Sequence, residues 1–168
     1  AHVKDLLSVV RWADNPRHRI AGFRAARLVP GIGPATATRL LDALDASHDV
    51  PAALRAFEAP AAARIEWEGL LGLIRVLSDP KVRWPADLDA ATRWYEPCLE
   101  RLYDDAPVRR GDLAQLAQIA STYVSRERFL TEMALDPPEA TSDRAGVALK
   151  DDDYLILSTI HSAKGPEW

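Results

Sequence analysis

The amino-acid sequence predicts an all-α body followed by a single β-strand, and three observations support this fold class. Up to residue 135, apolar residues recur at the three- and four-residue spacing of amphipathic helices. Proline-containing breaks such as Asn15-Pro16 and Asp79-Pro80 separate these stretches, as expected at helix ends. A β-prone run, Tyr154–Ile160, comes only after a polar linker over residues 136–152 that contains Pro137-Pro138.

The predicted helices follow one another through short connections. The first places Val3, Leu6, Leu7 and Val10 on one stripe and ends before Asn15-Pro16. Proline at the first turn predicts where the third and fourth helices begin. The later helices carry leucine, alanine and aromatic residues at helical spacing. After the first, the predicted ranges are 20–28, 34–44, 51–57, 60–78, 87–103, 110–123 and 125–135.

Length and composition restrict the class of protein. At 168 residues the chain is long enough for one domain with a hydrophobic core. The single cysteine, Cys98, excludes an internal disulfide framework and a multi-cysteine zinc site, and we expect a cytoplasmic protein. Because no apolar run approaches the ~18 residues of a membrane span, we expect no membrane association.

The net charge of −4 hides a local basic region. Between Arg11 and Arg39 there are six arginines and only one carboxylate, Asp14. Because salt screens charges beyond about 8–10 Å, this local field decides whether phosphate can bind there. The arginines are Arg11, Arg17, Arg19, Arg24, Arg27 and Arg39.

A glycine-rich turn lies inside this basic region. The sequence Pro30-Gly31-Ile32-Gly33 separates two predicted helices, and Pro34 occupies the favoured first-turn position of the second helix. Glycine lets the backbone take positive φ and approach a ligand closely. The unpaired N–H groups at the following helix N-terminus favour an anion. The pattern matches a helix-hairpin-helix, which binds the DNA backbone without reading sequence.

Side chains near the turn suit the same task. Arg27 and Arg39 flank it, and the Thr36 and Thr38 hydroxyls are candidate donors to phosphate. Such a turn is also an ordinary sharp connection between helices, with Ile32 filling the core. The arginines on both sides favour DNA contact.

The last twelve residues, Leu157–Trp168, carry the most specific pattern. The predicted strand enters a polar turn, His161-Ser162-Ala163-Lys164-Gly165, which is typical of phosphate-facing loops. The spacing Thr159-x-His161-x-x-Lys164-Gly165-x-Glu167-Trp168 resembles motif V of the UvrD/Rep/PcrA-type superfamily one helicases, T-x-H-x-x-K-G-L-E-[FW]. Pro166 departs from this pattern, in which leucine is usual.

The resemblance extends over the whole chain. In these helicases a helical 2B subdomain is inserted into the RecA-like α/β motor domain 2A, and it carries a Gly-Ile-Gly hairpin near its start. The resemblance thus implies a helix leading from 2A at 1–15 and a 2B subdomain at 16–148. The helix-hairpin-helix would lie at 20–44, and the return to 2A with motif V at 149–168. We therefore expect the chain to be a segment of a longer protein.

The same resemblance implies functional residues. Thr159, His161 and Lys164 would lie on the loop that contacts single-stranded DNA, and Glu167 would reach the ATP ribose. Gly31, Ile32 and Gly33 would contact the backbone of the duplex ahead of the motor.

The expected function is DNA binding within an ATP-dependent 3′–5′ DNA helicase of repair or recombination. ATP and Mg²⁺ would serve the parent protein, because this chain has no G-x-x-x-x-G-K-[ST] phosphate loop. No residue of the chain is assigned to catalysis or to a metal. The expected partners are duplex DNA or a single-strand/duplex junction, together with repair proteins.

Two alternatives remain open. A stand-alone helix-hairpin-helix repair enzyme, such as a base-excision glycosylase, would need a catalytic aspartate in a Val-Asp-Thr-His-like context, which the stretch 45–50 does not match. A protein-interaction or autoregulatory module would instead bind another protein or restrain the motor.

Overall fold

The computed structural model describes residues 1–135, in which all the regular secondary structure is helical, as the sequence predicts, and no strand is present. The elements are α1 (His2–Asp14), α2 (Arg19–Ala26), α3 (Pro34–Ala46), α4 (Val50–Ala56), the 3₁₀ helix η1 (Ala61–Ala63), α5 (Arg64–Leu77), α6 (Ala86–Leu102), α7 (Ala106–Ser121) and α8 (Arg126–Leu135). The linker at 136–152, the strand at 154–160 and motif V lie outside the described residues and remain predictions.

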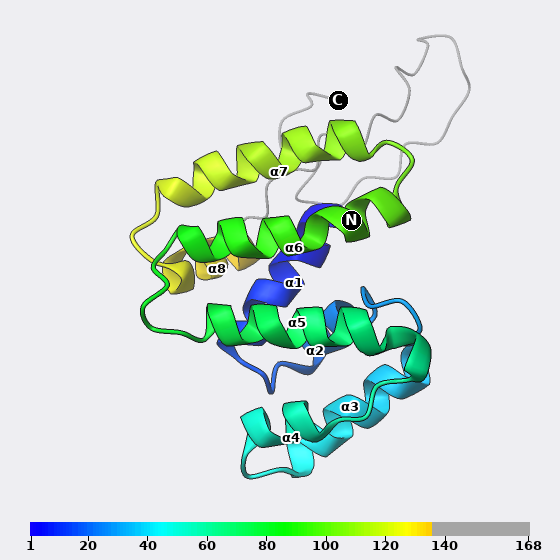
Figure 1. Ribbon diagram of the computed structural model, residues 1–168. Coiled ribbons are helices and arrows are strands. Elements are labelled where there is room, and N and C mark those ends of the chain that lie inside the picture. The colour runs from blue at the N-terminus through cyan, green and yellow to red at the C-terminus, as the bar shows by residue number, and fades with distance from the viewer. Residues whose placement is uncertain (136–168) are drawn as a thin grey trace, which may run out of the picture. The chain divides into compact units, whose positions relative to one another are not determined.

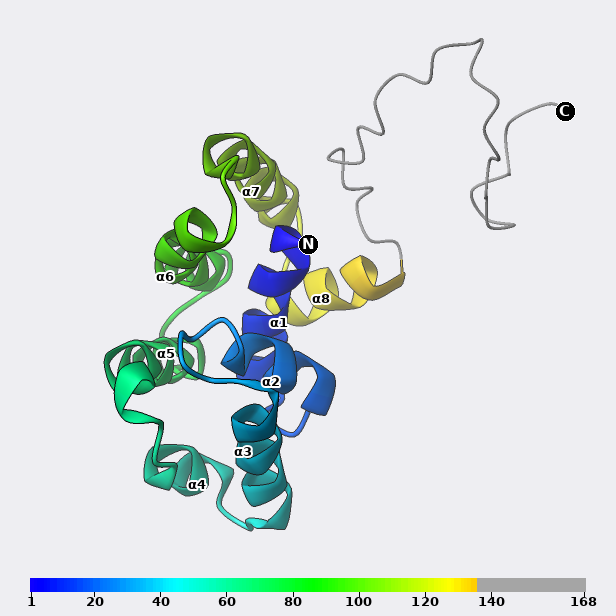
Figure 2. The same ribbon diagram turned by 90° about the vertical axis from the view of Figure 1, so that its right-hand side faces the viewer.

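Helix α1 is the centre of this unit. It packs against α2, α5, α6 and α7, and Figures 1 and 2 show it crossing behind the layer that α5, α6 and α7 form side by side. Its side chains are buried on nearly all sides, including Leu6, Val9, Val10 and Trp12 at 1% exposure or less. The buried positions of α1 also include polar residues, which need partners inside the unit.

Helices α3 and α4 continue from α2, which packs against α1. Figure 1 shows α2 beside α5, with α3 and α4 below them, and the three helices α2, α3 and α4 pack in chain order. Side chains cap the N-termini of α2 and α4. His18 Nδ1 accepts the Ala21 N–H at 3.2 Å, and Asp49 Oδ1 accepts the Ala52 N–H at 2.9 Å. These contacts satisfy N–H groups that a helix cannot pair internally.

Several helix ends differ from the predicted ranges for local reasons. Helix α2 ends at Ala26 because the Leu28 and Val29 N–H groups bond to carbonyls only three residues earlier, which tightens the last turn. The predicted 60–78 helix begins with the 3₁₀ turn η1. Helix α7 starts at Ala106 rather than 110, since Pro107 is accommodated in its first turn.

Candidate nucleic-acid interface

The connection between α2 and α3 is a tight turn with two exposed glycines. The Ile32 N–H donates to the Val29 carbonyl at 3.1 Å, which closes the turn. Gly31 has φ +84°, a left-handed conformation that favours glycine. The Ile32 side chain is only 5% exposed and packs in the core, so it cannot reach a ligand. Among the three hairpin residues, Gly31 and Gly33 therefore form the accessible surface.

The N-terminus of α3 opens directly from this turn. Gly33 is the N-cap, Pro34 fills the first helical position, and no side chain caps the helix. The amides of Ala35 and Thr36 therefore lie in a first turn where α-helices leave N–H groups unpaired. Ala35 is exposed and Thr36 is half-buried. The helix dipole adds partial positive charge at this end, an arrangement that attracts phosphate oxygens.

Arg27, the C-cap residue of α2, and Arg39, in the second turn of α3, have no carboxylate partner in the described part of the chain. Both are exposed, and within residues 1–135 neither forms an ion pair with a carboxylate. Instead, the Arg27 guanidinium lies 5.6 Å from the centre of the Phe23 ring, and the Arg39 guanidinium lies 5.6 Å from that of Phe57. Stacking on an aromatic face leaves the N–H edges of a guanidinium free to bind an anion.

The other four arginines of the basic region are engaged within the protein, which corrects the charge count made from sequence. Arg19 pairs with Asp42 and Asp45 of α3, and Arg24 pairs with the buried Asp5 of α1 at 2.6 Å. Folding brings these carboxylates to arginines some 20 positions away along the chain, so a count over one sequence window overstates the local positive charge.

The remaining two, Arg17 and Arg11, bind carbonyls rather than carboxylates. Arg17 donates to the carbonyls of Leu44, Asp45 and Ser47 at the end of α3, and Arg11 lies 3.5 Å from that of Leu130. Cations favour the carbonyl end of a helix, so Arg17 stabilises the C-terminus of α3. Of the six arginines, only Arg27 and Arg39 are left to act at the turn.

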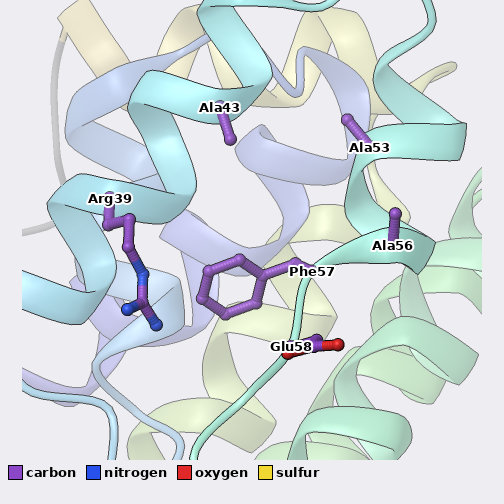
Figure 3. A pocket seen from close by; sticks show the side chains of 6 residues that line it. All are labelled: Arg39, Ala43, Ala53, Ala56, Phe57 and Glu58. Carbon is purple, nitrogen blue, oxygen red and sulfur yellow. The ribbon is translucent and has the colours of Figure 1, made fainter.

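A groove of about 490 Å³ lies between α3 and α4. Figure 3 shows the Arg39 side chain extending toward the Phe57 ring, with Glu58 next to it and alanines on the remaining wall. Small alanine side chains make the groove open, and the nearby carboxylate of Glu58 makes it less favourable for an anion than the turn itself. The candidate interface is therefore the turn with Arg27 and Arg39.

Two residues that sequence reasoning did not single out support the turn from beneath. Arg101 of α6 donates to the Leu28 carbonyl at 2.6 Å. A Cβ on Gly31 would lie 3.4 Å from both the Cβ and the backbone nitrogen of Ala63, so the turn rests on η1. No local pattern in the sequence could reveal these contacts, because they join segments more than 30 residues apart.

The other expected site residues fall outside residues 1–135. These are Thr159, His161, Lys164 and Glu167, whose roles remain predictions from the motif. Within the described part of the chain, no group of three or more histidine, cysteine, aspartate or glutamate side chains is arranged to hold a metal ion. In the same part, no helix combines the length and apolar character needed to cross a membrane.

None of the protein-family models, curated proteins or solved structures compared with this chain matches it.

Proposed function

We propose that this chain is the DNA-binding 2B region of an ATP-dependent 3′–5′ DNA helicase of the UvrD/Rep/PcrA type. The observation that carries the proposal is the α2–α3 turn. There, exposed Gly31 and Gly33 lead into a helix N-terminus without a side-chain cap. Arg27 precedes this turn and Arg39 follows it along the chain, and neither forms an ion pair within residues 1–135.

The chemistry of this turn suits a phosphate backbone of any sequence. Backbone N–H groups and guanidinium groups bind phosphate oxygens, which are the same at every base pair. The turn would hold the duplex, while motif V residues of the parent protein contact the single strand and the nucleotide. ATP and Mg²⁺ belong to that parent, whose reading frame should encode a phosphate loop upstream and a motor motif with its arginine downstream.

Salt dependence of DNA binding tests the proposed role of the turn. We expect the chain to bind a tailed duplex, and the Arg27→Ala/Arg39→Ala variant to lower the slope of log K against log salt by about 0.9 per lost contact. The measurement is fluorescence anisotropy with labelled DNA between about 50 and 200 mM salt.

The matched control is Arg75→Ala/Arg93→Ala. These arginines of α5 and α6 are also exposed and form no ion pair within residues 1–135. An unchanged slope in the Arg27/Arg39 variant, or an equal change in the control, would remove the turn from the interface. Cleavage of a lesion-bearing duplex by the chain would favour the repair-enzyme alternative, and no binding even at low salt would favour a protein-interaction module.

A further inference from the structure

The carbonyl group of Leu28 lies at the junction between α2 and the turn. Arg101 Nη2 donates to it at 2.6 Å, and Cys98 Sγ lies 3.9 Å from the same oxygen. Both donors come from α6, about 70 residues later in the chain. Among residues 1–135 no backbone N–H outside the helices bonds to this oxygen, so Arg101 is its strongest partner.

This contact links the turn to a helix that contributes nothing else to the candidate interface. Leu28 lies two residues beyond Ala26, the last residue of α2, and its carbonyl oxygen accepts a charge-assisted hydrogen bond from the guanidinium group. The Leu28 side chain is buried in the core, so both its side chain and its carbonyl group are held in place. Farther along the turn, Gly31 rests on Ala63. The turn is thus attached to the rest of the unit before and after Pro30.

We propose that Arg101 is a positioning residue for the DNA interface. It holds the end of α2 so that Gly31, Gly33 and the first turn of α3 keep the orientation in which they face phosphate. Arg101 Nη2 is bonded to the Leu28 carbonyl, so the role assigned to Arg101 is to hold the turn, and the salt slope of DNA binding distinguishes this role from a phosphate contact. The proposal rests on the proposed function in naming DNA as the ligand, although the contact with the turn exists independently of any ligand.

The DNA-binding test compares Arg101→Met and Arg101→Lys with the control Arg93→Met on the same helix. We expect Arg101→Met to weaken binding about three- to tenfold with an unchanged salt slope, because a charge-assisted hydrogen bond is lost but no phosphate contact is. Lysine can still donate to the Leu28 carbonyl and should restore most of the affinity. Thermal unfolding of each variant ensures that binding is measured on folded protein.

Two results would overturn the proposal. A slope lower by about 0.9 in Arg101→Met would make Arg101 a phosphate contact. Unchanged affinity would make the bond to Leu28 irrelevant to binding.

Amide hydrogen exchange tests the positioning step without DNA. The Ile32 N–H, bonded to Val29, should exchange faster in Arg101→Met, whereas the Tyr123 N–H, bonded to Ala120 after α7, should not change. An Ile32 N–H that exchanges at the same rate in the wild type and in Arg101→Met would contradict the positioning role. If Ile32 exchange rises while the wild-type chain binds no DNA, the positioning stands and the proposed function fails.

Discussion

Among single residues, Gly31 has the strictest conformational requirement in the α2–α3 turn. Its positive φ and its contact with η1 mean that any side chain there is strained, whatever the ligand. By contrast, Gly111 in the exposed face of α7 has open space where a Cβ would stand. Substituting each glycine with alanine therefore distinguishes a position that requires a left-handed backbone, Gly31, from one that does not, Gly111.

Gly31→Ala should lower the free energy of unfolding by about 1–2 kcal/mol, the cost of a left-handed conformation for a residue with a Cβ. Gly111→Ala should raise it by about 0.5–1 kcal/mol, since alanine loses less backbone entropy in a helix. Urea denaturation followed by circular dichroism measures both values. Equal effects at the two positions would show that the turn does not require glycine.

Among residues 1–135, His2 is a buried histidine whose protonation should affect stability near neutral pH. Its side chain is fully buried, its Nδ1 lies 3.0 Å from Arg109 Nη1, and its Nε2 lies 3.1 Å from Asp112 Oδ2. Burial, with the positive charge of Arg109 adding to it, lowers the pKa of His2 below its ordinary value of 6.5, although Asp112 acts in the opposite direction. The unfolded chain therefore takes up this proton more readily than the folded chain.

Stability should consequently fall as pH drops below 6.5 and should be fully present above it. We expect the free energy of unfolding to decrease less in His2→Gln than in the wild type between about pH 7.5 and pH 5.5. His48→Gln is the control, because His48 is exposed. Identical pH profiles for wild type and His2→Gln would rule out this linkage.

At the scale of elements, the crossing of α1, α2 and α3 sets the position of the turn. Gly22 of α2 lies against side chains of both α1 and α3: a Cβ there would stand 2.5 Å from Trp12 Nε1 and 2.6 Å from Leu41 Cδ2. Trp12 is held in place because its Nε1 donates to the Pro16 carbonyl at 3.0 Å. The indole therefore has little freedom to move away from an added methyl group.

Gly22→Ala should destabilise the fold by roughly 1–3 kcal/mol through overpacking at this crossing. Gly69→Ala is the matched helical control, since its Cβ would make an ordinary 3.6 Å contact with Trp94 Nε1. Thermal denaturation of the two variants compares them directly. A Gly22→Ala protein as stable as the Gly69→Ala protein would mean that the helices can separate at no cost.

A polar cluster around the buried Asp5 joins α1 to α2 and α6. Asp5 Oδ1 accepts from Arg24 of α2, and Oδ2 accepts from the hydroxyls of Tyr95 and Tyr103, at the end of α6, at 3.1 and 3.0 Å. Burial and the neighbouring Asp5 carboxylate raise the pKa values of both tyrosines, so they remain neutral donors. Because both oxygens of the buried Asp5 carboxylate accept hydrogen bonds, the cluster fixes α1, α2 and α6 in one arrangement.

At the scale of the whole molecule, the sequence predicts the positions of the helices well but not their mutual contacts. Helical periodicity and proline breaks are local signals, so the eight predicted helices correspond to α1 through α8 with small shifts at their ends. The pairing of Arg24 with Asp5, the support from Arg101 and the role of Gly22 depend on tertiary packing. A single sequence carries no local pattern for such contacts.

The candidate site likewise has features that the sequence predicts and features that depend on tertiary contacts. The turn and its exposed glycines could be located from Pro30 to Pro34 alone, whereas the burial of Ile32 and the neutralisation of Arg19 and Arg24 required the fold. The fold therefore narrows the predicted basic region to Arg27 and Arg39. The motif at the end of the chain remains a prediction from resemblance.

The most direct test of the central claim is an amide chemical-shift titration of the ¹⁵N-labelled chain with duplex DNA. We predict that the largest shifts occur at the N–H groups of Gly31, Gly33, Ala35 and Thr36, because in the proposed complex these groups would face the phosphate backbone. Shifts confined to other surfaces, with these four amides unchanged at saturating DNA, would contradict the claim that the α2–α3 turn is the DNA interface.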